Sequence, residues 1–327
     1  MSLSIIKAGI LSTIQDGGRY GYQHQGINPT GAMDQFSSKL SNCLLGKDLN
    51  APVIELHFPA PTFQFNVATI FAITGANFTP AIDNKKIPLN HPIAVNKNTT
   101  LQFKKAVSGA RCYLSIFENL HLNAWLGSFS TNLKAEAGGF NGSVLRKDDV
   151  ISFEKKYKLS HLLNEKNFVV LPWFAQSNRE TLTDKIEVIE GKEWHLLSQK
   201  SKIEFEETSF TISTSADRMG YRLKGNQLHL EEEKQLVSAG VTFGTVQLLP
   251  NGQLIILMAD HQTTGGYPVI ANVISAHLPL LAQLKPNEIL SFKRTDVGKA
   301  EQKLLAQHKY LQSVKHAASF KINDLFT

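Results

Sequence analysis

The sequence predicts a mainly β protein, and three observations point to this class. Between Val53 and Ser152, short apolar runs recur about every ten residues and are separated by turn residues, a spacing typical of a barrel or sandwich. The unbroken apolar run Leu254–Ala259 is too short for a confident helix and favours a buried strand. Glycine-rich turns separate several of these runs and suit the tight connections of a β fold.

Length and composition limit the possible classes of protein. The chain has 327 residues, 42% hydrophobic and 19% charged, which suits one large or two medium soluble domains. Its formal net charge of +6 is spread over scattered lysines and arginines, so a solvated surface is favoured over a nucleic-acid site. The two cysteines, Cys43 and Cys112, form no C-x-x-C motif and are expected to be reduced in a cytoplasmic protein. No signal peptide or membrane-spanning segment is expected.

The first half is predicted to begin with a strand and then a helix. Residues 2–14 alternate loosely and read as a strand, and the glycine-rich turn at 16–22 follows. Asp34 is a good N-cap for a helix that carries Phe36, Leu40 and Leu44 on one face, and Gly46 would follow its end.

The second half is predicted to follow a polar linker at 155–166. Strands are expected at 168–171, 186–189, 210–213 and 289–292, a short helix at 277–283, and a last helix from Asp296 to about Leu311. We therefore expect an N-terminal β-rich domain (1–160), a second β domain (161–295) and a C-terminal helix with its tail (296–327).

The stretch 238–268 is the centre of this prediction. A strand at 241–249, a turn at Leu249–Gly252 and the apolar strand at 254–259 deliver the polar loop Asp260–Tyr267 to a rigid position. Such a loop can bind a ligand, or it can simply satisfy its own hydrogen bonds. We predict that it borders a main cleft.

Two short patterns occur in both halves. Arg19 and Arg218 each begin an Arg-x-Gly-Tyr segment, and the endings of 13–15 and 245–247 share Thr-[Ile/Val]-Gln. These echoes are weak signs of a duplication. Arginine can recognise a carboxylate or phosphate bidentately, but Arg19 could instead pair with Asp16, and Arg218 with Asp217.

Several chemistries lack their usual sequence patterns. The histidines show no metal-binding spacing. There is no P-loop, no G-x-G-x-x-G opening a helix and no G-x-S-x-G. Any ATP site would therefore have to be diffuse or shared with another chain.

Five motifs together are similar to the biotin-dependent carboxyltransferase-like family, also called allophanate hydrolase subunit 2. They are Thr-Ile-Gln-Asp-x-Gly-Arg-x-Gly at 13–21, Gly-Ala-Met-Asp at 31–34, Leu-Gly-Ser-x-Ser-Thr at 126–131, Asp-Arg-Met-Gly-Tyr-Arg-Leu at 217–223 and Thr-Thr-Gly-Gly-Tyr-Pro at 263–268. The resemblance covers about residues 5–295. The family includes KipA proteins and the C subunits of bacterial 5-oxoprolinases.

The resemblance implies two cyclophilin-like β-barrel halves with a few short helices. It also implies two partners, the B and A subunits of 5-oxoprolinase. The complex of the three chains would convert 5-oxoproline to glutamate and would use ATP together with magnesium. No tightly bound cofactor and no metal site are expected in this chain. The alternatives are a carboxyltransferase acting on urea or a related amide with a separate biotin carrier, and a non-enzymatic KipA-type regulator that binds a kinase-inhibitor protein.

Three departures from the family pattern stand out. They are Phe117-Glu118-Asn119, the pair Gly142-Ser143 with Lys147-Asp148-Asp149, and Ala239 in place of a usual glutamate. The first two could alter a contact with a partner, and the third removes a possible acid or base.

No catalytic residue can be assigned from the sequence. The candidates for binding substrate or nucleotide are Asp16, Arg19, Asp34, Asp217, Arg218, Tyr221, Arg222, Gln247, Asp260, Gln262, Thr263, Thr264, Gly265, Gly266 and Tyr267.

Overall fold

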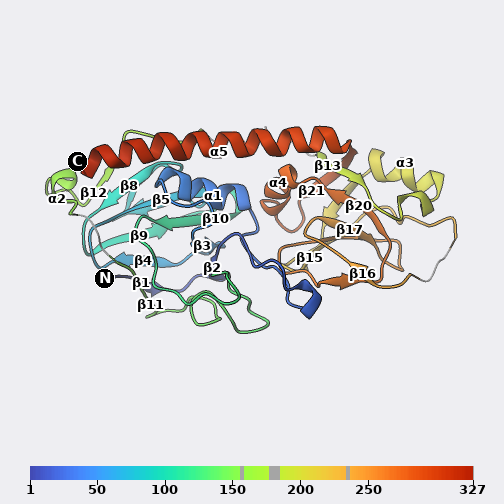
Figure 1. Ribbon diagram of the computed structural model, residues 1–327, viewed down its shortest axis with the longest axis horizontal. Coiled ribbons are helices and arrows are strands. Elements are labelled where there is room, and N and C mark those ends of the chain that lie inside the picture. The colour runs from blue at the N-terminus through green and yellow to red at the C-terminus, as the bar shows by residue number, and fades with distance from the viewer. Residues whose placement is uncertain (155–157, 177–184, 233–235, 327) are drawn as a thin grey trace. The chain divides into compact units, whose positions relative to one another are not determined.

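The computed structural model describes residues 1–154, 158–176, 185–232 and 236–326. These residues divide into two compact units, which are described separately below (Figure 1). The first unit comprises the described residues within 1–18, 34–178 and 308–327, and the second those within 19–33 and 179–307. The first three residues of the expected linker at 155–166 lie outside the described residues.

Two sheets of six described strands each build the first unit. One sheet has the strand order β11-β1-β4-β9-β6-β7 and the other β12-β8-β5-β10-β3-β2. The strands of the first sheet are β1 (Ser2–Lys7), β4 (Thr62–Phe65), β6 (Pro80–Ile82), β7 (Lys85–Lys86), β9 (Thr99–Phe103) and β11 (Val150–Ser152). Those of the second are β2 (Ser12–Gln15), β3 (Val53–Leu56), β5 (Thr69–Asn77), β8 (Pro92–Val95), β10 (Ser108–Ile116) and β12 (Phe168–Val170).

Alternation along these strands fills the space between the two sheets. Phe63 and Phe65 of the first sheet share one buried cluster with Phe71 and Ile73 of the second, which is the packing of a sandwich. Helix α1 (Gln35–Leu44) covers the other face of the second sheet, where Leu40 and Leu44 pack against Ile70. Helix α2 (Ser160–Leu163) forms where a linker was expected.

The predicted start and end of α1 are confirmed. The Asp34 carboxylate accepts a hydrogen bond from the Ser37 amide at 2.8 Å, as an N-cap does, and Gly46 lies beyond the end with φ of 62°. Cys43 and Cys112 are both buried, as predicted, and they are not joined in a disulfide. Burial raises the pKa of the Cys43 thiol to about 12, so this thiol is unreactive at neutral pH.

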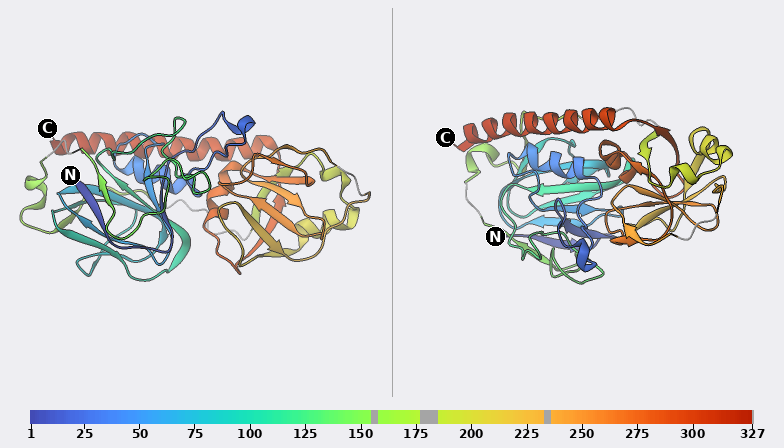
Figure 2. Two further views of the ribbon diagram at one scale, coloured as in Figure 1. Left: turned by 90° about the horizontal axis from the view of Figure 1, so that it is seen from below. Right: turned by 45° about the vertical axis from the view of Figure 1, so that its right-hand side comes forward.

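The second unit is a closed barrel, and Figure 2 shows it from two further sides. Its described strands follow the order β13-β20-β17-β18-β15-β14-β21, and β21 closes the barrel by pairing with both β13 and β14. The bounds are β13 (Lys185–Glu190), β14 (Ser209–Ile212), β15 (Gly220–Lys224), β17 (Thr245–Leu248), β18 (Leu254–Leu257), β20 (Val269–Val273) and β21 (Ile289–Arg294).

Smaller elements complete the barrel unit. A separate ribbon pairs β16 (Ala239–Gly240) with β19 (Thr264–Gly265), and the helices are α3 (Gln199–Glu207) and α4 (Leu278–Ala282). The predicted turn is present, because the Gly252 amide donates to the Leu249 carbonyl at 2.9 Å. The buried cluster of this unit includes Phe205 of α3 and the strand residues Phe210 and Phe292, whose ring centroids lie within 6.4 Å of one another.

The two units differ from the expected domain boundaries in three places. Strand β12 pairs with β8, so it ends the first unit and does not open the second. Residues 19–33 belong with the barrel, because Met33 lies in the barrel core and the Asn28 amide donates to the Asp260 carbonyl. The third difference is the last helix, described next. The contacts of β12, Asn28 and Met33 join residues that are far apart in the sequence, and the periodicity of hydrophobic residues carries no information about such contacts.

The last helix is much longer than predicted. Helix α5 spans Val297–Phe326, with its residues up to Gln307 in the second unit and those from His308 in the first. Leu311 is buried as expected, but Ala318 and Ile322 continue the buried side, so the end near Leu311 was wrong. No glycine or proline follows Gly298, and nothing in the sequence therefore stops the helix at Leu311. No helix in the described part of the chain is long and apolar enough to cross a membrane.

Candidate functional site

A cavity of about 460 Å³ lies against the barrel of the second unit, a size typical of small-molecule sites. Its wall combines strands β15, β17 and β18 with the loops at 215–219, 249–251 and 262–267. The lining residues are Ser215, Asp217, Met219, Gly220, Arg222, Gln247, Leu249, Pro250, Asn251, Ile255, Gln262 and Tyr267.

Strand alternation explains which side chains reach this wall. Along β15, Tyr221 and Leu223 point into the barrel core, so Gly220 and Arg222 face the opposite way. Arg222 pairs with Ile255 of β18, and Ile255 pairs with Gln247 of β17. The three side chains therefore form one row across three neighbouring strands on the outer face of the barrel.

Gln247 is completely buried and holds the loop at 264–267. Its Nε2 donates to the Tyr267 carbonyl at 3.2 Å, whereas its Oε1 has no hydrogen-bond partner among the described residues. A Cβ at Gly265 would lie 2.6 Å from this Nε2, so only glycine lets the loop approach the amide. This close approach explains why the Thr-Thr-Gly-Gly-Tyr-Pro motif has glycine at position 265.

Arg222 and Asp217 place opposite charges on the cavity wall. The Arg222 side chain is exposed, and no ion pair or hydrogen bond of its guanidinium is present among the described residues. The Asp217 carboxylate accepts hydrogen bonds from the amides of Met219 at 2.8 Å and Gly220 at 3.1 Å, which shape the turn into β15.

Arg218 lies outside this wall and forms an internal lock. Its Nε and Nη2 bind the two oxygens of Asp260 at 2.7 and 2.9 Å, and Nη2 also donates to the Gly31 carbonyl at 2.7 Å. The Asp260 amide donates back to the Arg218 carbonyl at 2.7 Å. Arg218 is 7% exposed, so this bidentate pair is largely shielded from water. The bidentate partner is thus Asp260, and not Asp217, which sequence proximity indicated.

Other predicted residues lie inside the protein framework. Tyr221 belongs to the barrel core, and Arg19 is 1% exposed and donates from Nη1 to Thr30 Oγ1 at 2.7 Å. The Asp34 carboxylate caps α1. Asp16 accepts from Ser128 Oγ at 2.7 Å and from the Phe129 amide at 2.6 Å, which ties the 126–131 motif to the end of β2.

The structure thus gathers only some of the predicted residues around the cavity. Asp217, Arg222, Gln247, Gln262 and Tyr267 line it. Thr264 and Gly265 form β19, and the Thr263 carbonyl accepts a hydrogen bond from the Val241 amide at 3.1 Å. A Cβ added at Gly266 would lie 3.2 Å from Ser238 Oγ. The polar loop therefore borders a cavity through Gln262 and Tyr267, while Asp260 serves the lock.

Several wall residues were not predicted. Ile255 belongs to the apolar run for which the sequence favours a buried strand, and Asn251 belongs to the predicted turn at Leu249–Gly252. The outward row could have been found by counting alternate positions in β15, β17 and β18. The register that aligns them depends on long-range strand pairing and could not be predicted.

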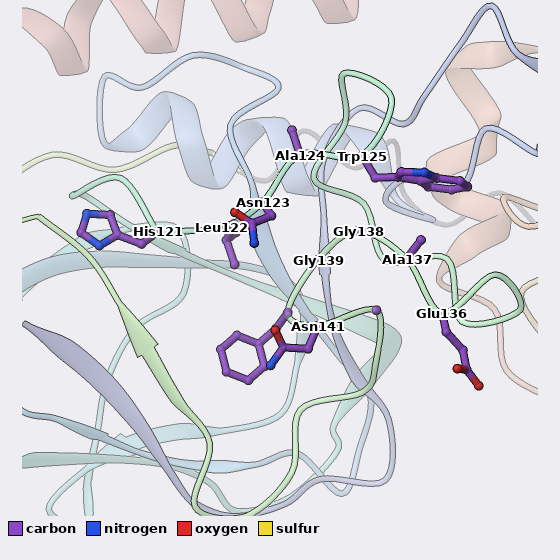
Figure 3. Close-up of a pocket in the computed structure, with 12 residues that line it drawn as sticks. His121, Leu122, Asn123, Ala124, Trp125, Glu136, Ala137, Gly138, Gly139 and Asn141 are labelled. Carbon is purple, nitrogen blue, oxygen red and sulfur yellow. The ribbon is translucent and has the colours of Figure 1, made fainter.

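The first unit has a second cavity, of about 370 Å³, in which the segment 121–125 faces the glycine-rich loop at 138–142 (Figure 3). None of the predicted site residues lines it. Gly139 packs so closely that an added Cβ would lie 1.9 Å from Thr131 Oγ1, which links this loop to the 126–131 motif.

The departures from the family pattern have local explanations. Glu118 is buried, accepts a hydrogen bond from Thr69 Oγ1, and lies beside Lys47, so it serves packing within the unit. Burial lowers the pKa of Lys47 to about 8, and Glu118 opposes that shift. Ser143 is half-buried and its hydroxyl donates to the Phe140 carbonyl. Ala239 is exposed and pairs with Gly265, so a glutamate there would lie beside the cavity loop.

The barrel thus carries a polar, glycine-dependent loop beside an outer cavity, an arrangement that is common in small-molecule sites. The model of the family described as "Carboxyltransferase domain, subdomain A and B" matches residues 25–294, and the chain belongs to this family. The fold and the sequence motifs agree with this membership.

Two relatives and one solved structure are similar to this chain over nearly its whole length. The chain is 33% identical to the 5-oxoprolinase C subunit of Haemophilus influenzae, covering 98% of this chain and 99% of the relative. It is 32% identical to the 5-oxoprolinase C subunit of Escherichia coli, covering 95% and 97%. The crystal structure of the K. lactis urea amidolyase matches with a TM-score of 0.85 at 24% identity, covering 96% of this chain but 20% of that one, and shows the shared fold.

Proposed function

We propose that this chain is the C subunit of an ATP-dependent 5-oxoprolinase, which converts 5-oxo-L-proline to L-glutamate in a cytoplasmic hetero-oligomer with the A and B subunits. One observation carries the proposal: the chain matches two proteins named as 5-oxoprolinase C subunits over at least 95% of both sequences in each pair. The urea amidolyase match extends over only a fifth of that protein, which leaves the urea-directed alternative with less support.

The reaction demands charge stabilisation more than a strong nucleophile. In the proposed route, the γ-phosphoryl group of ATP moves to the lactam oxygen and ADP leaves. Water then adds to the activated carbon, the ring C–N bond breaks with protonation of nitrogen, and a second water releases phosphate from the resulting acyl phosphate. Phosphoryl transfer and the final hydrolysis place negative charge on the leaving phosphate oxygens, which cationic and hydrogen-bonding groups stabilise, whereas ring opening requires a proton for the leaving nitrogen. The cavity of the barrel unit offers Arg222, Gln262 and Asn251 as cationic and hydrogen-bonding contacts for the substrate.

The proposal predicts that the chain alone is inactive. ATP, with its magnesium, would be bound wholly or partly by the A and B subunits. We expect the contact with the B subunit to exceed about 1,000 Å², the usual lower bound for a specific interface.

The test is to purify this chain, assemble it with its cognate partners, and measure glutamate formation from 5-oxoproline and ATP. Turnover is expected only when all three proteins are present. Turnover by the single chain, or full turnover by the A and B subunits without it, contradicts the proposal. ATP-dependent consumption of urea with a biotinylated carrier would support the carboxyltransferase alternative instead, and binding of a kinase-inhibitor protein without any turnover would support the KipA-type regulator.

A further inference from the structure

We propose that the barrel cavity is the binding site for a small cyclic amide bearing one carboxylate, with Arg222 binding the carboxylate and Gln247 Oε1 accepting the ring N–H. This inference rests on the proposed function and deepens it, because it places the substrate contact in this chain and in particular residues. It also decides between the two ligands, lactam and nucleotide, that the sequence left open for these positions.

The strand register sets the distance between the two polar groups. Arg222 and Gln247 both pair with Ile255, one from each side, so their Cα atoms are separated by two strand spacings, roughly 10 Å. The Arg222 side chain is long enough to span much of that distance and to bring its guanidinium over Ile255. A ligand lying on Ile255 can therefore reach both groups at once.

The Gln247 oxygen supplies the first reason for expecting a ligand. Because Nε2 donates to the Tyr267 carbonyl, the orientation of the Gln247 side-chain amide is fixed, and Oε1 remains to accept a hydrogen bond. That oxygen is buried and has no hydrogen-bond partner in the part of the chain that the structure describes, although Gln247 forms part of the cavity wall. A buried carbonyl without a donor is costly, and a ligand N–H placed there would remove that cost. A site built this way rejects analogues that lack the N–H.

The charges on the wall supply the second reason. Arg222 is a cation whose guanidinium has no ion pair among the described residues, and its planar fork matches a carboxylate. Asp217 lies on the same wall and contributes one negative charge. The single cation Arg222 can balance one ligand carboxylate, and the Asp217 carboxylate disfavours any further negative charge on the ligand. A nucleotide triphosphate would meet the Asp217 carboxylate with several negative charges and only one arginine to balance them.

The remaining wall residues suit the ring of such a ligand. Ile255 gives an apolar floor between the two polar groups, and the half-exposed Met219 and Tyr267 supply further apolar surface from the loops. A few polar groups placed around an apolar surface are the usual composition of a small-molecule site.

The site is tested in the assembled complex by the KM for 5-oxoproline. We expect Arg222→Gln and Gln247→Met each to raise it about 10- to 100-fold, the range for losing one buried or charged hydrogen bond. Lys224→Gln is the control for Arg222, because Lys224 is the next outward residue of β15 and does not line the cavity. Gln15→Met is the control for Gln247, since Gln15 is equally buried in the matching Thr-Ile-Gln segment and also has an unpaired Oε1. Both controls should keep the wild-type KM.

A ligand series tests the same contacts without altering the protein. N-Methyl-5-oxoproline lacks the ring N–H, and 2-pyrrolidinone lacks the carboxylate. As competitors of 5-oxoproline, both should bind at least about 10-fold more weakly than the substrate. Equal affinity of the N-methyl compound contradicts the role of Gln247, even if Gln247→Met fails to fold.

Calorimetric titration of the assembled complex with 5-oxoproline separates this proposal from the proposed function. Turnover together with unchanged binding in both variants overturns the site and leaves the function standing. Binding that both variants weaken, in a complex that forms no glutamate, supports the site and overturns the function. Competition of ATP with 5-oxoproline for binding, lost in Arg222→Gln, would show that the cavity takes the nucleotide and would overturn the lactam assignment.

Discussion

Arg218 and Arg222 stand at the two ends of one short segment and have opposite environments. Arg218 is buried, and its guanidinium is bound by Asp260 and the Gly31 carbonyl. Arg222 is exposed on the cavity wall, and no ion pair of its side chain is present among the described residues. The difference follows from where the chain enters β15, because Arg218 precedes the strand and Arg222 occupies an outward strand position. The same residue type in the same motif thus stabilises the fold at one position and is available to a ligand at the other.

The largest expected effect is on stability and comes from Arg218. Arg218→Ala leaves the Asp260 carboxylate without its bidentate partner and the Gly31 carbonyl without its donor. We expect the free energy of unfolding to fall by about 3–5 kcal/mol, as for breaking other buried pairs. Urea unfolding of the purified chain measures it.

The matched comparison is Arg222→Ala, which should change the free energy of unfolding by no more than about 0.5 kcal/mol, as expected for an exposed side chain. Equal losses of stability in the two variants would contradict the distinction between Arg218, which stabilises the fold, and Arg222, which does not.

The next effect is on activity and comes from Arg222. At 5-oxoproline concentrations below the KM, Arg222→Ala should lower glutamate formation by the assembled complex about 100-fold, because the substrate carboxylate loses its cationic partner. Arg222→Lys retains the charge without the fork and should recover part of the loss. An Arg222→Ala complex with wild-type activity would show that the arginine on the wall, like many exposed charges, has no functional contact.

The sequence predicted much of the fold for reasons that are local. The N-cap Asp34 and the turn at Leu249–Gly252 depend on neighbouring residues, and both were found. The strands around the turn are also present, but they are shorter than predicted, at Thr245–Leu248 and Leu254–Leu257. The prediction of Arg218 as part of a binding site was based on the same motif as Arg222. Its partner Asp260 lies 42 residues away, so only the folded chain shows that the pair is internal.

The weak internal echo illustrates the same limit. Tyr221 lies in the barrel core, whereas Tyr22 precedes the short turn of 3₁₀ helix at Gln23–Gln25 and is only half-buried. Gly21 has a positive φ in open space, whereas Gly220 lies in a strand against Ile255. The two Arg-x-Gly-Tyr segments therefore have different local structures, and the shared sequence pattern did not predict a shared role.

A smaller effect should come from Gly265, where the loop meets Gln247. In Gly265→Ala the new Cβ would lie 2.6 Å from Gln247 Nε2 and 3.3 Å from Val241 Cγ1, so the loop or the amide must move. We expect a loss of about 1–3 kcal/mol in the free energy of unfolding, as for other overpacked sites, and a raised KM for 5-oxoproline. Gly240, on the partner strand β16, has nothing within 4 Å of an added Cβ and provides the control. If Gly240→Ala and Gly265→Ala behave alike, contact with Gln247 is not what requires glycine at position 265.

The smallest effect is a pH dependence at His261, which is adjacent to the lock residue Asp260. Burial lowers the pKa of His261, and its contact with the Gln262 carbonyl and the nearby Asp260 charge only partly oppose that shift. In the unfolded chain the imidazole has its ordinary pKa of about 6.5, so the unfolded state takes up the proton first as the pH falls. The contribution of His261 to stability is therefore full above about pH 6.5 and decreases as the pH falls through the lower folded-state pKa. His261→Gln removes this titration, and urea unfolding of both proteins between about pH 7.5 and 5 should show a steeper loss of stability in the wild type. Parallel pH profiles would mean that His261 binds its proton equally well in both states, and that the loop after β18 is more open to water than the structure shows.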